Sequence, residues 1–384
     1  MEEFLMKKIG HEVAFWATGE NNPRNGECDF IRLKDGRLLC AYSRFYGEKW
    51  SDYAPANIVA RCSEDEGETW GEEFILAERD AGAQNYMCPN LLRMPNGDMG
   101  LIYGRKYTPN DGSELKAYTE KWFVRSADEG KTWSTPVRCT PEREYNVIEN
   151  DHVIRLQSGR IVIPLNRSVV GVNAYGDKTW GGKFFVCASD DDGATWREIC
   201  ENQSLPQEEY SKTGLQETAL YQKEDGTVWA LSRTDMGFQY EAFSTDDCET
   251  WTQQRPNRFF TSPRSPLLMK KGGKYTIAVF NPIPAYTGQP PVELWGRTPL
   301  VCAVSTDDGA TFPKVFYLED DRNFNYCYPA IFPGEDYFLI SYYHSNGTNT
   351  PLNSTKVTKV FFHELEQEAV ASAHTPGDIP IKKN

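Results

Sequence analysis

Short apolar runs alternate with polar turns along most of the chain, and the same arrangement returns six times. Each unit has a polar residue, an apolar stretch, a turn and a second apolar stretch, as in CDFIRLKDGRLLCAYSR and PNLLRMPNGDMGLIYGR. The turns centre on Gly36, Gly97, Gly159, Gly226, Gly273 and a position near Glu335. Asp-Gly and Asn-Gly between apolar runs are strong signals for tight hairpins. The pattern therefore predicts six β-hairpins.

A second repeated phrase, Ser-x-Asp-x-Gly-x-Thr-Trp, lies out of phase with the hairpins. Its five copies, some with small changes, start at Ser63, Ser126, Ser189, Ser244 and Ser305. Each copy follows an apolar run, which predicts a third strand, and a fourth strand follows the aromatic residue that ends the copy. Self-similarity at a near-fixed period indicates stacked structural units. The sequence thus predicts an all-β fold, a six-bladed β-propeller of four-stranded antiparallel blades.

The repeat also predicts the domain organisation. A length of 384 residues allows two or three domains, but a closed ring of blades is one domain spanning residues 1–384. The sixth unit lacks the Asp-rich turn, so we expect an N-terminal strand near residues 11–17 to complete the last blade and remove a free sheet edge. Residues after about 368 are expected to form a short C-terminal tail.

Composition excludes several classes of partner. The net charge of −14 argues against nucleic acid and anionic membrane surfaces, and no apolar run is long enough to span a membrane. The N-terminus lacks the apolar core of a signal peptide, and the ten cysteines lie mostly in apolar strands. We therefore expect a cytoplasmic protein, with secretion left open if a signal has been removed. With no Cys-x-x-Cys pair and five scattered histidines, we expect neither a metal nor a cofactor.

Polar residues at strand ends define the expected pocket. Inner strands of a propeller start at one face of the channel, so the side chains at those starts and at the ends of the paired strands converge there. The first group is Glu27, Asp29, Asn90, Asn150, Asp151, His152, Glu217, Arg264, Tyr326 and Tyr328, and the second is Arg44, Arg105, Arg167, Arg233, Asn281 and His344. Buried charge is costly without a purpose, although some of these groups could form structural ion pairs. For Asp151 and His152 two interpretations stay open: they bind substrate, or they pair with each other or with Arg167.

With its Asp-box (BNR) turns and six-unit period, the chain resembles the sialidase superfamily from about residue 20 to 365. That resemblance implies three arginines that hold the carboxylate of a substrate, a Tyr nucleophile paired with a Glu, and an Asp acid/base. Carried over residue by residue, it implies Tyr326 as nucleophile, Glu217 as its activating partner and Asp52 as acid/base. Arg233 and Arg297 match the second and third arginines.

The chain departs from the family at the first arginine. Family members carry it in an Arg-Ile-Pro phrase, where this chain reads NPRNGECDFIRL with Gly26 or Glu27 at that place. Arg24 could reach in from a loop, and Arg44 or Arg264 could compensate. We expect Glu27 to shape specificity. The competing interpretation is that Glu27 pairs with Arg297 or Arg264 and neutralises the positive charge that would bind the substrate carboxylate.

The resemblance therefore implies a retaining, sialidase-like exo-glycoside hydrolase that acts on a terminal acidic sugar, sialic acid or a related one. Its partner would be a small carbohydrate or glycan. Two alternatives stay open: a glycosidase or lyase for a neutral or uronic sugar, and a non-catalytic carbohydrate-binding propeller. A calcium loop at SDDDG is disfavoured, because no Glu completes an EF-hand.

Overall fold

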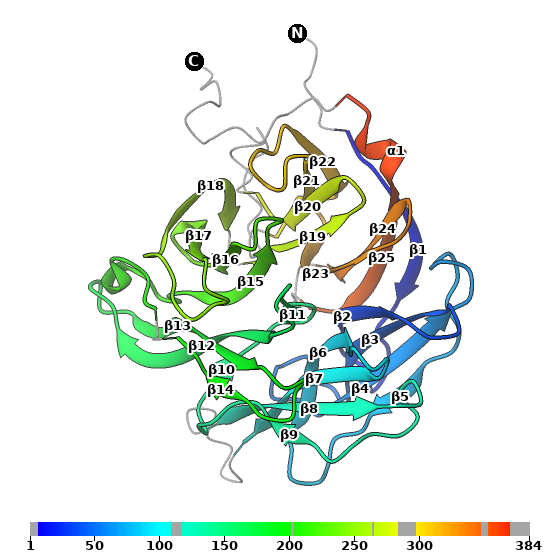
Figure 1. Cartoon of the computed structure of the whole chain (residues 1–384), viewed down its shortest axis with the longest axis horizontal. Helices are drawn as coiled ribbons and strands as arrows, with labels where there is room; N and C mark the ends of the chain where they lie inside the picture. Colours follow the sequence, from blue (N-terminus) through cyan, green and yellow to red (C-terminus); the bar gives the residue numbers. More distant parts are fainter. Residues whose placement is uncertain are drawn as a thin grey trace.

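The computed structural model describes residues 7–108, 117–200, 203–262, 265–282, 297–346 and 352–368. Arg264 and the expected tail after residue 368 lie outside these ranges. The described chain confirms an all-β propeller, in which the sheets radiate from a common axis (Figure 1). No described helix is long and apolar enough to cross a membrane.

Three sheets are four-stranded and antiparallel. One contains β15 (Gln216–Gln222), β16 (Val228–Arg233), β17 (Gly237–Ser244) and β18 (Arg255–Ser262). The next contains β19 (Leu268–Gly272), β20 (Tyr275–Phe280), β21 (Leu300–Ser305) and β22 (Lys314–Glu319). The third contains β23 (Asn325–Pro333), β24 (Tyr337–Ser345), β25 (Ser354–Phe361) and β1 (His11–Trp16).

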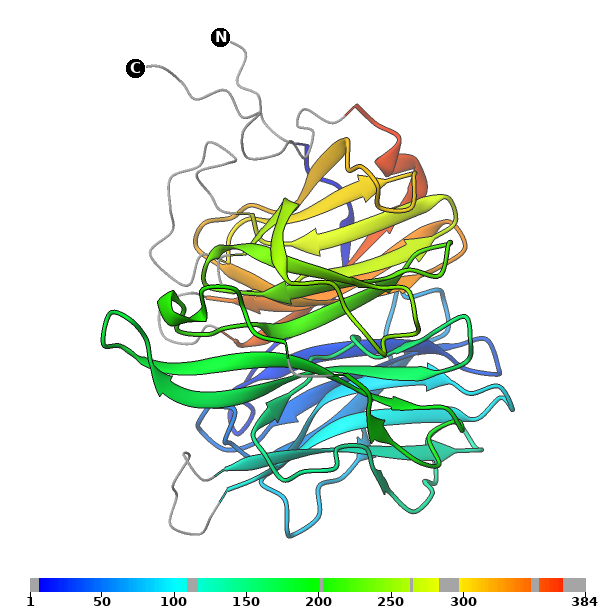
Figure 2. The same ribbon diagram turned by 60° about the vertical axis from the view of Figure 1, so that its left-hand side comes forward.

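A five-stranded sheet precedes these three in the chain. It contains β10 (Asn146–Val147), β11 (Ile154–Arg155), β12 (Ile161–Val172), β13 (Lys178–Ser189) and β14 (Arg197–Glu198). Its β12–β13 hairpin extends well beyond the neighbouring sheets (Figure 2). Two short helices, η2 (Glu208–Tyr210) and α1 (Phe362–Leu365), lie outside the sheets.

The N-terminal third forms one eight-stranded sheet. Its strands are β2 (Asn25–Arg32), β3 (Leu38–Phe45), β4 (Ala56–Ser63), β5 (Phe74–Ala77), β6 (Asn85–Arg93), β7 (Met99–Tyr107), β8 (Tyr118–Ser126) and β9 (Val137–Arg138). The first two repeat units, β2–β5 and β6–β9, are each antiparallel and share a single parallel pair, Ala56 with Asn85. By hydrogen bonding, four sheets are therefore separate blades and the fifth unites two repeat units, where the sequence predicted six separate blades.

The two ends of the chain meet in one sheet. Strand β1 pairs antiparallel with β25, from His11 opposite Lys359 to Trp16 opposite Thr355. A buried cluster that includes Trp16, Leu38 and Leu339 fills the space between this sheet and β2–β4. The N-terminal strand thus joins the last strands of the chain to the first sheet.

The Asp-rich turns share one hydrogen-bond scheme. At the third copy, the Asp191 carboxylate accepts bonds from Ser189 Oγ at 2.8 Å, Thr195 N at 2.8 Å and Thr195 Oγ1 at 2.6 Å. The same contacts recur at Asp65, Asp128, Asp246 and Asp307. Each carboxylate is occupied by its own turn, which makes these repeats structural.

Candidate active site

A pocket of about 620 Å³ opens where several inner strands begin, a volume typical of small-molecule sites. Seven cationic and four acidic side chains line it: Arg24, Lys106, Lys121, Lys178, Lys212, Arg233 and Arg297, and Glu27, Asp52, Glu149 and Glu217. No residue of the Asp-rich turns is among the lining residues. In a protein of net charge −14, this excess of cations makes the pocket suited to an anionic ligand.

A repeated β-bulge aims side chains into the pocket. The pairing register shifts in β2, β6, β15 and β23. At these shifts Glu27, Cys88, Glu217 and Tyr328 have φ of 58°, 55°, 46° and 56°, and all four line the pocket. A bulge breaks the alternation of a strand and turns a side chain in a new direction. The same β-bulge, repeated in four strands, therefore places four of the pocket residues.

Tyr328, Glu217 and Arg233 form a buried contact group. Tyr328 Oη donates to Glu217 Oε1 at 3.0 Å, and Arg233 Nη1 donates to Glu217 Oε1 at 2.6 Å and to Tyr328 Oη at 3.1 Å. The Arg297 guanidinium lies over the Tyr328 ring, 5.2 Å from its centroid. Burial and then the Glu217 charge raise the pKa of Tyr328 well above its usual range, although Arg233 and Arg297 oppose this. The resting phenol is therefore neutral and placed to give its proton to Glu217.

The structure corrects the choice of tyrosine. Tyr326 does not line the pocket; its ring packs edge-on against Tyr342 and His344 in a hydrophobic cluster. Residues two apart on a regular strand share a face, but the bulge at Tyr328 reverses that relation. The predicted Tyr326–Glu217 pairing is wrong, and Tyr328 takes the place beside Glu217.

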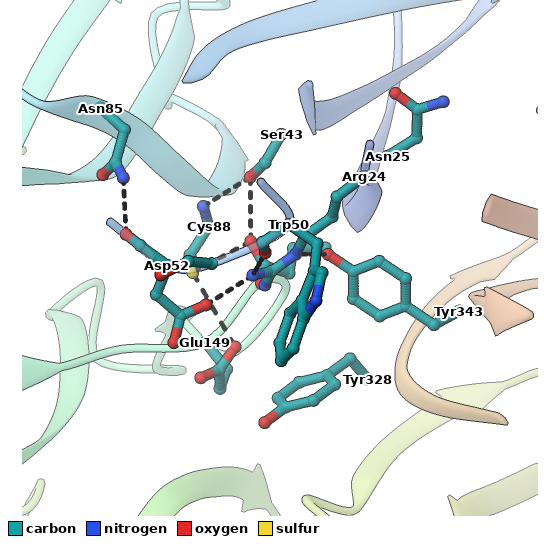
Figure 3. Close-up of polar contacts among 12 residues, drawn as sticks. Arg24, Asn25, Ser43, Trp50, Asp52, Asn85, Cys88, Glu149, Tyr328 and Tyr343 are labelled. Carbon is teal, nitrogen blue, oxygen red and sulfur yellow. Dashed lines mark hydrogen bonds and ion pairs between the residues drawn. The ribbon is translucent and has the colours of Figure 1, made fainter. Parts of the chain in front are cut away.

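Arg24 enters the pocket from the segment before β2 (Figure 3). Its side chain is buried and donates to Asp52 Oδ1 at 2.5 Å, to Tyr343 Oη at 2.7 Å and to Glu27. Ser43 Oγ donates to the other oxygen of Glu27 at 3.0 Å. Arg24 thus lines the pocket together with Arg233 and Arg297, and Glu27 supports Arg24 instead of pairing with Arg297.

Asp52 lies on the loop between β3 and β4. Partial desolvation opposes its ionisation, but attraction to Arg24 and Lys106 prevails and lowers the pKa of Asp52 to about 2. Asn85 Nδ2 donates to its backbone oxygen at 2.7 Å (Figure 3). Asp52 is therefore held as a carboxylate, fixed by both its side chain and its backbone.

The other arginines at strand ends do not reach the pocket. Arg44 pairs with Glu73 at 3.0 Å and lies over the Tyr46 ring. Arg105 pairs with Asp80 at 2.6 Å, and Arg167 pairs with Glu144 and Glu198. The expectation that Arg44 binds substrate is contradicted, because its guanidinium is committed to an ion pair on the blade.

Asp151 and His152 also lie apart from the pocket. Asp151 accepts from Ile331 N at 2.8 Å and pairs with Lys270 at 2.6 Å, so it links the loop between β10 and β11 to strands β23 and β19. His152 Nδ1 lies 2.6 Å from Asn150 O. Their predicted role in substrate binding is contradicted, and the partner of Asp151 is Lys270 instead of His152 or Arg167.

Sequence reasoning missed Glu149, Cys88, Lys106 and Lys121, which line the pocket. A signal for the first two was present in the repeats. Asp29, Asn90 and Asp151 each accept a backbone N–H from another sheet or repeat unit, from Leu91, His152 and Ile331 respectively. The residues two positions before them are Glu27, Cys88 and Glu149, the pocket positions. Aligning the units on these acidic and amide residues would have identified both.

Glu27, Cys88 and Glu149 place one potential metal-ligating atom each within 4.8 Å of the others. A thiolate is the form that binds metals, but burial and then the Glu27 and Glu149 charges raise the pKa of Cys88 well above its usual range. Glu27 already accepts from Arg24 and Ser43. These contacts make the three residues a hydrogen-bonded part of the pocket wall.

Comparison with known proteins places this geometry in a family. The family described as BNR repeat-like domain matches residues 36–340. An exo-alpha-sialidase from Aspergillus fumigatus is 32% identical over 140 residues, 35% of this chain and 34% of that protein. The chain thus matches about a third of the length of this curated relative.

Two solved structures share the fold. The NanB sialidase of Streptococcus pneumoniae superposes with a TM-score of 0.70 at 12% identity, covering 93% of this chain and 71% of that one. A protein of unknown function from Dyadobacter fermentans superposes with a TM-score of 0.68 at 18% identity, covering 91% of this chain and 99% of that one.

Proposed function

Because this chain belongs to the family of BNR repeat-like domains, we propose that it is a sialidase-like, retaining exo-glycoside hydrolase that removes a terminal acidic sugar, sialic acid or a related one. The observation that carries the proposal is the 3.0 Å contact between Tyr328 Oη and the Glu217 carboxylate. A neutral phenol beside a proton acceptor suits attack on an anomeric carbon that bears a carboxylate, because it approaches without charge repulsion.

The proposed reaction has two displacements. Arg24, Arg233 and Arg297 hold the sugar carboxylate. Tyr328 Oη bonds to the anomeric carbon while Glu217 takes its proton, and the glycosidic bond breaks as Asp52 protonates the leaving oxygen. A water then gives its proton to Asp52 and attacks the same carbon, and the phenol leaves with the proton held by Glu217. Two displacements at one carbon retain its configuration.

Substrate binding would prepare Asp52 for its role. Arg24 pairs with the Asp52 carboxylate and holds its pKa at about 2, too low for a general acid near neutral pH. A substrate carboxylate would compete for the same guanidinium. Losing this partner would raise the pKa of Asp52, which is the direction that a general acid requires. The contact thus keeps the acid ionised until an acidic sugar arrives.

An acidic substrate is favoured over a neutral one by the contacts of Glu27. An ion pair between Glu27 and Arg297 would have neutralised the positive charge that Arg297 offers to a substrate carboxylate. Glu27 instead accepts from Arg24 and Ser43, while Arg233 and Arg297 stand with Tyr328. Two guanidinium groups beside the nucleophile fit a substrate whose carboxylate lies next to the reacting carbon.

The test is a screen of fluorogenic sialosides, uronides and neutral glycosides, with the first-formed anomer identified by proton NMR. We expect sialosides or related acid sugars to be cleaved with retention. Tyr328→Phe should lower kcat/KM by roughly a thousandfold or more with the fold intact. Tyr326→Phe is the matched control and should stay within about tenfold of wild type. Inversion, or full activity of Tyr328→Phe, would reject the mechanism.

We also infer that the propeller has six blades. The two repeat units of the eight-stranded sheet are each antiparallel, and one parallel pair, Ala56 with Asn85, links them. Counting these units as two blades gives six with the four separate sheets. A crystal structure with continuous pairing between β4 and β6 would contradict this count.

A further inference from the structure

Two buried lysines line the pocket on strands β7 and β8. Lys106 and Lys121 are only 4% and 2% exposed. Lys106 Nζ donates to Asp52 O at 3.0 Å and Tyr145 Oη at 3.2 Å. Lys121 Nζ donates to Thr119 Oγ1 at 3.1 Å and Asn146 O at 2.9 Å. All four acceptors are uncharged.

These lysines differ from Lys359, the third buried lysine among the described residues. Among the described residues, no carboxylate oxygen lies within 4.0 Å of either ammonium nitrogen. Lys359, which is 3% exposed, pairs with Glu68 at 2.6 Å. A buried ammonium without a counterion is rare because its desolvation is uncompensated. Two of them facing the same pocket point to an anion that arrives from outside.

The acids that line the pocket form no direct ion pair with either lysine among the described residues. Burial, with Glu217, Glu27 and Asp52 adding to it, raises the pKa of Glu149 well above its usual range. The Asp52 carboxylate is engaged by Arg24. Burial, more than any neighbouring charge, lowers the pKa of Lys121 to about 7. An incoming anion would restore its charged form.

Space beside Lys121 is kept open by Gly104, which also lines the pocket. A Cβ at this position would lie 3.7 Å from Lys121 Nζ and 3.4 Å from Met87 O. Any larger side chain would therefore fill the approach to the ammonium. Asp52 connects the two lysines to the arginines, since its carboxylate accepts a hydrogen bond from Arg24 and its backbone carbonyl accepts one from Lys106.

We propose that Lys106 and Lys121 form a second anion-binding subsite, and that the substrate is a sugar acid with a second anionic group, such as a sulfate, phosphate or further carboxylate. The first carboxylate goes to the arginines and the second group to the lysines. Each ammonium uses two of its three N–H donors on the protein, which leaves one donor per lysine for an oxyanion. The substrate part of this inference rests on the proposed function; the anion site does not.

The first experiment measures dissociation constants by calorimetry at low ionic strength. The probes are N-acetylneuraminic acid and a panel of its O-sulfated and O-phosphorylated forms. We expect at least one dianionic form to bind wild type tenfold or more tightly than the parent sugar. Lys106→Met and Lys121→Met should each reduce this preference to about twofold. Lys131→Met, which removes the same charge from an exposed Asp-rich turn far from the pocket lining, should retain it.

The second experiment needs neither sugar nor turnover. Inorganic sulfate and inorganic phosphate are titrated into wild type, Lys106→Met/Lys121→Met and Arg297→Met. We expect the double variant to lose at least tenfold in affinity for one of the ions, and Arg297→Met to retain a lysine-dependent binding event. Equal affinity in wild type and the double variant would overturn the subsite. Lysine-dependent ion binding without glycosidase activity would instead reject the proposed function and keep the subsite.

Discussion

Tyr328 contacts Glu217 because its own backbone has a φ of 56°, within the bulge of β23. Tyr326, two positions earlier, lies on the regular part of the strand. The same left-handed conformation at Glu27, Cys88 and Glu217 turns three more side chains inward. Non-glycine residues pay about 1 kcal/mol or more for such a backbone. Its return at four equivalent positions, all at the pocket, indicates that the strain serves the site.

Lys121 gives a prediction about stability. Its pKa is lowered from 10.5 to about 7 on folding, so the unfolded chain binds more protons between these values and stability rises with pH there. Removing the charge should help most below pH 7 and cease to help above about pH 10.5. Lys121→Met should therefore gain roughly 2–4 kcal/mol at pH 6, since each pKa unit corresponds to about 1.4 kcal/mol. Urea unfolding at pH 6 and pH 9.5 measures the difference.

The exposed Lys131→Met variant is the control and should show no such pH dependence. An equal or smaller gain for Lys121→Met at pH 6 than at pH 9.5 would contradict a charged, uncompensated ammonium. Because the substitution removes a buried charge, the variant should remain folded, so its loss of dianion binding can be measured on intact protein.

Arg24 gives a second prediction. If its guanidinium holds the pKa of Asp52 at about 2, removing it should move that pKa up towards the ordinary value of about 4. Arg24→Met should be combined with Glu27→Gln, because a single substitution would leave Glu27 buried and unpaired. Carbon-13 NMR of labelled aspartate follows the titration, with Asp52→Asn to assign the signal. An unchanged pKa would assign the effect to Lys106 instead.

At this scale, family resemblance located the residues whose surroundings are local to one strand or loop. Among the candidate residues, Glu217, Arg233, Arg297, Glu27 and Asp52 line the pocket, and their roles stay predictions. The choice between Tyr326 and Tyr328 depended on a bulge that spacing alone does not reveal. Lys106 and Lys121 had no motif, since their significance is the absence of a counterion, which is known only once neighbouring strands are placed.

Among the elements, the turns were the most predictable and the inner strands the least. Each Asp-rich turn closes on itself within a few residues, as at Asp191 with Ser189 and Thr195, so its sequence contains the whole cause. The pairing of strand β11, by contrast, depends on how the neighbouring sheets pack, which the local sequence does not show. This is why the five-stranded sheet, whose sequence predicted a single hairpin at this place, instead has both β10 and β11 paired with β12.

The turns give the third prediction. Asp191→Ala removes an acceptor that holds Ser189 and Thr195, which should cost about 1–2 kcal/mol of stability, since net hydrogen-bond contributions are near 1 kcal/mol each. Activity should be unchanged, because no residue of this turn lines the pocket. Thermal unfolding and kcat/KM of one preparation test both parts. Lost activity in a folded Asp191→Ala protein would refute a purely structural role.

In the molecule as a whole, the ring is closed by strand β1. It hydrogen-bonds to β25 of the last sheet, while Trp16 stacks on Tyr42 of β3 with ring centroids 4.8 Å apart. One short strand therefore joins the end of the chain to its beginning (Figure 1). Strand β1 thereby covers the edge of β25 and becomes the outer strand of the last sheet. It also holds the β2 segment that carries Glu27 and follows Arg24.

This closure gives the last prediction. Trp16 is 8% exposed and its neighbour Phe15 is 44% exposed on the same strand. Trp16→Ala should cost about 3–5 kcal/mol, as for other buried aromatics, whereas Phe15→Ala should cost well under 1 kcal/mol. Because the seam lies next to Arg24 and Glu27, amide exchange in β2 and β25 should accelerate together in Trp16→Ala before the sheet of β15–β18 responds. Equal stability losses for the two substitutions, or amide exchange that rises uniformly around the ring, would mean that β1 does not contribute to closing the ring.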